Sequence, residues 1–136
     1  MNRGRVLAFD PGSKRIGVAV SDALRIVATP VGVIDAADPW DEIAGLIDEY
    51  SPEVVVVGLP ISLDGSEGPA AARARSFGEE LEQRHGRPVE YVDERYTTQT
   101  AESALIEGRV RRRDRKQAVD KVAAAVILRH YLTANP

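Results

Sequence analysis

Residues 6–20 read VLAFDPGSKRIGVAV, and this stretch decides the fold. A largely apolar run over 4–10 ends at Asp10, and apolar residues then alternate with glycine and alanine over 16–20. Alternation with a period of two is typical of a β-strand. The short Pro-Gly-Ser turn at 11–13 between the two runs predicts a hairpin. We therefore expect the chain to open with two antiparallel strands and to place a carboxylate where the first one ends.

The apolar patterns that follow the hairpin predict three more strands and four helices. The strands are expected over 26–34, 54–57 and 88–93, and the helices over 39–50, from Pro69 onward, over 97–108 and over 117–132. Asp38 is expected to cap the first helix, with Pro39 at its first position. This order predicts an α/β protein with a five-stranded mixed sheet: strands one to three form an antiparallel meander, and strands four and five are parallel. Helices cover both faces, and short right-handed connections place strand one beside strand four.

The last predicted helix has one apolar stripe, with a carboxylate at its border. At about 100° per residue the stripe contains Val119, Val122, Ala123, Val126, Ile127 and His130. His130 is therefore expected in the core, buried or half-buried. Asp120 lies at the edge of this stripe, so its carboxylate can stay at the end of the sheet while the helix packs.

Composition limits the classes of protein that fit. The 136 residues suit one domain, 1–136, and they include no cysteine, which excludes disulfides, zinc-thiolate sites and thiol nucleophiles. No apolar stretch reaches the roughly 18 residues of a membrane span. The first strand follows the N-terminus so closely that a signal peptide has no room. We expect a cytoplasmic protein that contacts no membrane.

The net charge of −3 argues against nucleic-acid binding until its distribution is considered. Residues 109–116 contain six basic residues and one acid, a net +5, so the other 128 residues sum to −8. Fifteen of the 18 basic residues are arginine, which suits bidentate phosphate contacts, although a GC-rich genome would also favour arginine. One basic segment on an acidic body is typical of a local phosphate-binding surface.

Three carboxylates lie where the fold is expected to bring them together. Asp10 and Glu94 end predicted strands, and Asp120 is on the last helix. Because side chains alternate along a strand, only one of Asp93 and Glu94 faces Asp10; Glu94 is our choice and Asp93 the reserve. Two carboxylates about 4 Å apart repel by roughly 4 kcal/mol at an effective dielectric constant of 20. A divalent cation removes this repulsion. The alternatives need no cation: Asp10 would only close a turn, Glu94 would belong to a solvated charge cluster at the end of a strand, and Asp120 would be a solvated residue at the rim.

Glycine-containing segments at two strand ends suggest a phosphate site. Gly12 is expected to adopt a positive φ and to leave amides of its turn exposed to an anion. The loop from Gly58 to Gly68 follows a buried strand, and its residues Gly58, Ser62 and Gly65 are expected to help cradle phosphate. Arg73 and Arg75 begin the next helix and could assist, although an exposed helix face is the simpler explanation for one of them.

Five ordered motifs make the chain similar to a known family. They are Asp10-x-Gly12 with Gly17 and Val18-Ala19-Val20-Ser21-Asp22; Gly58-Leu59-Pro60; Asp64-Gly65 up to Ala72-Arg73-Ala74-Arg75-x-Phe77; Asp93-Glu94-Arg95-Tyr96-Thr97-Thr98; and Lys116-x-x-Val119-Asp120-x-x-Ala123-Ala124, followed by Ile127-Leu128 and Tyr131-Leu132. In these motifs the chain resembles the YqgF family, also called RuvX, whose members are resolvase-like proteins of the RNase H-like superfamily. The resemblance spans nearly the whole chain.

The resemblance implies a nuclease that matures pre-16S rRNA during ribosome biogenesis, with Holliday-junction resolution in DNA recombination as the alternative. It implies Asp10, Glu94 and Asp120 as catalytic residues that bind one or two Mg²⁺ or Mn²⁺ ions. The expected partners are RNA or branched DNA and the pre-ribosome, and a monomer and a homodimer both stay open. The basic residues expected to hold the nucleic-acid backbone are Lys14, Arg15, Arg95, Arg109, Arg111, Arg112, Arg113, Arg115 and Lys116.

The chain departs from the family pattern at two positions. Ser62 stands where many members have asparagine, which changes a polar group of the loop. Ala123 lies one turn beyond Asp120, where classical junction resolvases often have a second aspartate. Three carboxylates instead of four imply a weakly held second metal, which favours RNA slightly over DNA junctions.

Two other classes of protein fit parts of the sequence. The Asp-x-Gly-Ser turn also resembles the phosphate loop of the actin and sugar-kinase superfamily, but such proteins close two related domains over ATP and this chain has room for one. A catalytically silent RNA-binding domain would retain the basic segment without binding metal. ATP hydrolysis without nuclease activity would identify the first class, and the absence of Mn²⁺ binding would identify the second.

Overall fold

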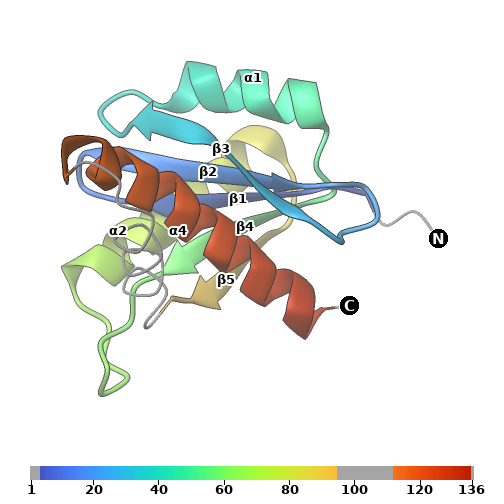
Figure 1. Ribbon diagram of the computed structural model, residues 1–136. Helices are drawn as coiled ribbons and strands as arrows, with labels where there is room; N and C mark the ends of the chain where they lie inside the picture. Colours follow the sequence, from blue (N-terminus) through green and yellow to red (C-terminus); the bar gives the residue numbers. More distant parts are fainter. Residues whose placement is uncertain (1–3, 95–111, 136) are drawn as a thin grey trace.

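The computed structural model describes residues 4–94 and 112–135, and the side chains of residues 4–94 and 122–135. Its sheet consists of β1 (Val6–Pro11), β2 (Arg15–Ser21), β3 (Ala28–Asp35), β4 (Val54–Leu59) and β5 (Val89–Asp93). The strand order is β3-β2-β1-β4-β5, antiparallel from β3 to β1 and parallel from β1 to β5 (Figure 1). The predicted five-stranded mixed sheet, with strand one beside strand four, is confirmed.

The central strands are formed by apolar residues that are buried on both sides of the sheet. Along β1, Val6 to Phe9 are fully buried, and they pair in parallel with the valine run of β4. Asp10 is the first polar residue of β1, and it pairs with Gly17 of β2. The buried apolar part of β1 therefore ends directly before Asp10, at the carboxyl end of the strand.

Helices cover both faces of the sheet. Helices α1 (Trp40–Tyr50) and α2 (Pro69–His85) pack on one face, where Phe9, Ile43 and Phe77 belong to one core cluster. Helix α4 (Arg112–Ala134) crosses the other face diagonally, and Ala8, Val56 and Ile127 belong to the core cluster beneath it. The N- and C-terminal ends of the described chain lie at the end of the sheet opposite the carboxyl end of β1 (Figure 1).

The predicted starts of the third strand and of the first helix are wrong by one or two residues, each for a local reason. The third strand begins at Ala28, because the amides of Ile26 and Val27 donate to Asp22 Oδ1 at 2.7 and 2.8 Å and so belong to a turn. Helix α1 begins at Trp40 with Pro39 as its N-cap and no side-chain cap, so the predicted capping by Asp38 is wrong.

The prediction for the last helix needs two corrections. The helix begins at Arg112 and not near 117, so the basic residues from 112 to 116 are helical. Its buried residues include Ala124, Ile127, Leu128 and Tyr131, whereas His130 is exposed, so the predicted stripe is displaced around the helix. The predicted helix over 97–108 lies outside the described residues. Within them, no helix combines the length and apolarity that crossing a membrane requires.

Candidate active site

The carboxyl ends of β1 and β5 bring two predicted site residues to the same edge of the sheet. Both strands flank β4 and run parallel to it, so their ends lie side by side. Asp10 occupies the end of β1. Glu94 directly follows β5, and its amide donates to Leu59 O at 3.1 Å, which continues the β4–β5 ladder by one residue. This backbone hydrogen bond fixes the position from which the Glu94 side chain extends.

Side-chain alternation places both carboxylates on the face that α4 covers. Val6 and Ala8 of β1 belong to the α4-side cluster, so Asp10 continues the same row. Val92 belongs to that cluster too, and Glu94 is two residues beyond it. Tyr91, in contrast, packs against the α1/α2-side cluster, in the same row as the exposed Asp93. Glu94, and not Asp93, therefore shares a face with Asp10.

The Asp10 and Glu94 carboxyl groups form a hydrogen bond. Burial of Glu94 raises its pKa to about 9, and the charge of Asp10, its hydrogen bond and the charge of Asp93 add to the increase. Glu94 Oε2 is shielded from solvent. A proton on one of two crowded carboxylates relieves their repulsion, and a bound cation can take its place.

Gly58 in β4 makes room for this pair. A Cβ at Gly58 would lie 2.9 Å from Glu94 Oε2 and would also collide with the Ile127 side chain of α4. The glycine follows four valines in the strand, so its role is to admit the carboxylate between the sheet and the helix. We predicted that Gly58 belongs to a phosphate loop after the strand. In the structure Gly58 lies within β4 and acts as a spacer.

Gly58→Ala is expected to lower the free energy of unfolding by about 1–3 kcal/mol, as overpacking of a filled site does, and to weaken Mn²⁺ binding by displacing Glu94. Gly45→Ala is the matched control, because a Cβ at this exposed helical position meets no atom within 4 Å. Chemical denaturation and Mn²⁺ calorimetry measure both effects. Equal stability and equal metal affinity of the two variants would contradict the spacer role.

The donor atoms of this pair fit a divalent metal ion. Carboxylate oxygens are the ligands that Mg²⁺ and Mn²⁺ prefer, and the two groups come from separate strands that the sheet holds rigidly. Among the described side chains, no three histidine, cysteine, aspartate or glutamate residues are placed so that they could hold a metal ion together. The third predicted ligand, Asp120, is in α4, in the part of the helix whose side chains lie outside the described residues.

The predicted nucleic-acid contacts are divided between two regions. Lys14 is exposed in the β1–β2 turn, and the half-buried Arg15 begins β2. Arg112, Arg113, Arg115 and Lys116 form the first turns of α4, but their side chains lie outside the described residues. Arg95, Arg109 and Arg111 lie outside them altogether. Their role in binding stays a prediction.

The Gly12 turn closes by a different geometry from the one expected. The Gly12 amide donates to Arg15 O at 2.8 Å, and its φ is not positive. A Cβ on Gly12 would lie 2.7 Å from that same carbonyl oxygen. Glycine is required here for the close approach of two backbone segments, and its own amide is already used within the turn.

The loop after β4 is held by its own polar groups. The amide of Ser62 donates to Ser66 O at 2.9 Å, and the amide of Gly65 donates to Ser62 O at 2.8 Å. The amide and hydroxyl of Ser66 both donate to Asp64 Oδ1. The amides of Ser62 and Gly65 are thus engaged within the loop in this conformation, and their predicted contact with phosphate stays a prediction.

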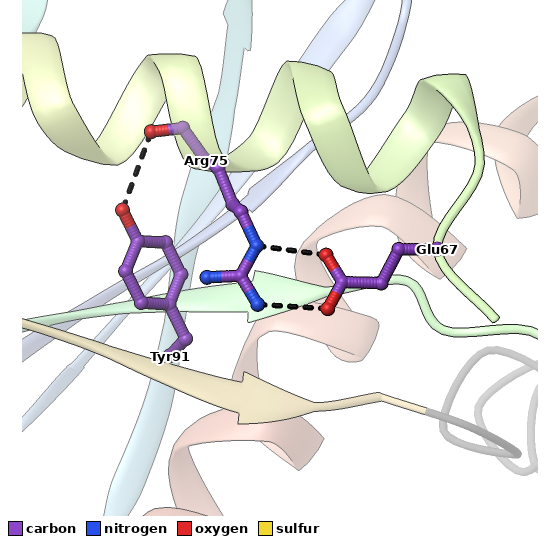
Figure 2. A network of polar contacts seen from close by, with 3 residues as sticks. All are labelled: Glu67, Arg75 and Tyr91. Atoms are coloured by element: carbon purple, nitrogen blue, oxygen red, sulfur yellow. Dashed lines mark hydrogen bonds and ion pairs between the residues drawn. The ribbon is translucent and has the colours of Figure 1, made fainter. Parts of the chain in front are cut away.

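Arg75 fixes the end of this loop to α2 and β5 (Figure 2). Its Nε and Nη2 donate to Glu67 Oε1 and Oε2 at 2.7 and 2.8 Å, and its guanidinium lies 5.3 Å from the centre of the Tyr91 ring. Tyr91 Oη in turn donates to Arg75 O at 3.3 Å. Arg73 and Arg75 were both predicted as possible phosphate contacts. The guanidinium of Arg75 is instead engaged by Glu67 and Tyr91.

Comparison with known proteins identifies relatives over nearly the whole chain. The family model described as RuvX, Holliday junction resolvase, matches residues 4–134. A Lactococcus lactis subsp. cremoris protein named "Putative pre-16S rRNA nuclease" is 46% identical over 136 residues, which cover 96% of this chain and 95% of the relative. A protein of the same name from Halothermothrix orenii is 44% identical over 131 residues and covers 94% of each chain.

Among solved structures, the fold resembles that of Thermus thermophilus RuvC. The chain of that protein in complex with a Holliday junction substrate superposes with a TM-score of 0.56, at 18% identity, over 96% of this chain and 94% of the other. A second structure of the same protein gives a TM-score of 0.51. At this identity the likeness concerns the fold, and it confirms the predicted RNase H-like architecture.

Proposed function

The chain belongs to the RuvX family, and from that premise we propose that it is a nuclease that hydrolyses phosphodiester bonds with divalent metal ions bound at Asp10 and Glu94. The observation that carries the proposal is the pair of carboxyl groups that the carboxyl ends of β1 and β5 hold on one face of the sheet, close enough to form a hydrogen bond. In sheets of this kind ligands bind outside the carboxyl ends of the strands. We propose pre-16S rRNA as the substrate.

Asp120 is the third proposed ligand. Positions 120, 124, 127 and 131 follow one another at intervals of four, three and four residues, which is the spacing of one helix face. Ala124, Ile127 and Tyr131 of that row are buried against the sheet. We propose that Asp120, one turn before Ala124, continues this row toward the carboxyl pair.

Each part of the chain has its own task in the proposed reaction. When bound, a divalent cation lowers the pKa of an attacking water and stabilises the leaving oxygen. Asp10 and Glu94 would hold this cation, and Glu94 would release its proton to solvent. The sheet fixes both side chains before substrate arrives, so little reorganisation is needed at the moment of reaction. Basic residues outside the pair bind the backbone and do not read sequence.

Basic residues lie close together in the described beginning of α4: Arg112, Arg113, Arg115 and Lys116. With one acid, Asp114, among them, they give this segment a net positive charge that attracts a phosphate backbone. We propose that the segment binds the backbone of the substrate.

Replacing Arg111, Arg112 and Arg113 by glutamate is expected to weaken nucleic-acid binding and to flatten its dependence on salt. The loss of three phosphate contacts lowers the slope of log affinity against log salt by about 2, because fewer counterions are released. Arg129→Glu at the other end of α4 is the control, since Arg129 is exposed and distant from the segment. Identical slopes for both variants would contradict a phosphate contact at 111–113.

One comparison of substrates tests the proposed function itself. The purified protein is incubated with an rRNA precursor and with a four-way DNA junction, each with Mn²⁺ or with EDTA. Manganese-dependent cleavage of the precursor at the 5′ end of 16S rRNA is expected. Cleavage of the junction alone would assign the chain to DNA recombination, the second candidate, which the description of the RuvX family as Holliday junction resolvases favours. The absence of cleavage of either substrate would overturn the proposal.

A further inference from the structure

A cavity opens at the carboxyl end of β1, on the face of the sheet opposite the carboxyl pair. It has a volume of about 270 Å³ and lies between the Gly12 turn, the start of α1 and the middle of α2. We propose that this cavity receives one unpaired nucleotide of the strand that the Asp10–Glu94 site cleaves, and this inference rests on the proposed nuclease function. The substrate would then be single-stranded next to the cleaved bond.

The cavity is close enough to the carboxyl pair for one strand to reach both. Its wall includes Pro11, Gly12 and Ser13, the residues that directly follow Asp10. Three residues span at most about 11 Å even when fully extended, so Ser13 lies within that distance of Asp10 along the backbone. A strand with a phosphate at Asp10 would cross the Gly12 turn and enter the cavity from its rim.

The walls have the mixture of groups that a nucleobase requires. Ile16, Trp40 and Phe77 supply apolar surface, and polar side chains from Ser13, Ser76 and Arg73 complete the lining. A flat apolar ring with hydrogen-bonding edges suits a cavity that is mostly apolar with a few placed polar groups. The volume lies just below the roughly 300–1,000 Å³ of typical ligand pockets, which fits one nucleotide.

Trp40 is held rigidly in this wall. Its ring stacks on Phe77 with centroids 5.5 Å apart, and the Arg84 guanidinium lies 4.4 Å from the ring centre on a cation–π contact. Arg84 also donates to Glu80 at 2.8 Å. Phe77 and Arg84 thus both contact the ring and hold Trp40 in the wall of the cavity.

The charges of the lining favour a nucleotide over a simple anion. Arg73 is exposed and forms no hydrogen bond or ion pair within the described part of the chain, so its guanidinium is available for phosphate or for stacking on a base. Glu80 also lines the cavity; its Oε2 is paired with Arg84, and its other carboxylate oxygen would accept a hydrogen bond from the amino group of a base. A paired base would first have to leave its stack, at a cost of a few kcal/mol.

Trp40 is the only tryptophan of the chain, so its fluorescence reports on this cavity alone. The full-length protein is titrated in EDTA, which prevents cleavage, with single-stranded RNA, a duplex of the same sequence and a nucleoside 5′-monophosphate. Anisotropy of labelled RNA measures binding in parallel. We expect single-stranded RNA to change Trp40 emission as it binds, the duplex to bind without that change, and the mononucleotide to require at least tenfold higher concentration.

Two variants locate the response. Arg73→Ala is expected to weaken single-stranded RNA binding about tenfold, whereas Arg129→Ala, which removes the same charge elsewhere, leaves it unchanged. Ala37→Phe fills the cavity from an exposed position and is expected to abolish the Trp40 response, with Mn²⁺ binding and the thermal midpoint unchanged. Equal effects of the Arg73 and Arg129 variants, or equal affinity for mononucleotide and strand, would overturn the assignment.

The outcomes separate this inference from the proposed function. Manganese-dependent cleavage by a protein whose Trp40 emission is indifferent to bound single-stranded RNA would overturn the nucleotide cavity and leave the nuclease intact. A Trp40 response that depends on Arg73, in a protein that cleaves neither RNA nor a junction, would overturn the nuclease and leave a single-strand binding site.

Discussion

Asp10→Asn is expected to reduce metal-dependent cleavage by at least about a hundredfold while the protein remains folded. Loss of groups that only support metal ligands costs 10–100-fold, so loss of a ligand should cost at least as much. The amide keeps the shape of the side chain and can still hydrogen-bond to Glu94, which removes the charge without opening a cavity. Single-turnover cleavage of an rRNA precursor with Mn²⁺ measures the loss.

The control for this variant is Asp48→Asn, which removes one exposed carboxylate from α1 without approaching the site. It is expected to cleave at the rate of the unmodified protein. Because the charge of Asp10 contributes to the raised pKa of Glu94, Asp10→Asn should also bring that pKa closer to its ordinary value. Retained cleavage by Asp10→Asn would show that the reaction occurs elsewhere on the molecule.

The metal-free protein is expected to lose stability as the pH rises from about 4.5 to about 9. In the unfolded chain Glu94 has its ordinary pKa of 4.5, whereas in the native state burial and the charge of Asp10 raise this pKa to about 9. Between these pH values the native state binds one proton more, so the free energy of unfolding falls as pH rises. Each pKa unit corresponds to about 1.4 kcal/mol, which makes the total loss several kcal/mol.

Chemical denaturation in EDTA at pH 5, 7 and 9 measures this effect, and Glu94→Gln identifies its source. The amide does not titrate, so the variant should lack the Glu94 contribution and become the more stable protein at pH 9. Glu42→Gln, an exposed acid of α1, should follow the unmodified protein. A Glu94→Gln variant with an unchanged pH profile would place the buried proton on another group.

Bound Mn²⁺ is expected to oppose the loss of native-state stability at high pH. A cation displaces the proton of Glu94, so Mn²⁺ affinity is expected to rise with pH up to about 9, with release of close to one proton per metal bound at pH 7. The ion also stabilises the native state by mass action, since the unfolded chain does not hold the two carboxylates together. Calorimetry in buffers of different ionisation enthalpy counts the protons.

Local alternation was sufficient to predict the sheet. The period of two through residues 16–20 defines the hairpin, and the valine run of β4 can only be a buried central strand. The same period allows only one of Asp93 and Glu94 to face Asp10, and the core clusters of the structure show that Glu94 does. Such predictions succeed because each strand residue has only two directions in which to point.

The last helix shows where sequence was not sufficient. Three consecutive alanines, 123–125, are all buried, so apolarity does not define one face there and the stripe that included His130 was displaced. The start of the helix was placed too late because the basic residues from 112 to 116 were taken as a separate segment. Arginine and lysine are good helix formers, so their charge pattern gave no reason for the helix to start later.

The site itself needed the tertiary structure. Gly58 is separated from Glu94 by 36 positions, and its role as a spacer depends on how β4, β5 and α4 meet. The cavity beside Trp40 is formed by three segments that no motif connects. A glycine inside a β-branched run was the one signal available, since it commonly marks a close approach of another group.

The most direct test of a metal held by the carboxyl pair is anomalous diffraction from crystals of the protein grown with Mn²⁺. The account predicts an anomalous peak bound to carboxylate oxygens of both Asp10 and Glu94, and no peak in crystals of Asp10→Asn. Glu94 still hydrogen-bonded to Asp10 at saturating Mn²⁺, with no metal between β1 and β5, would contradict it.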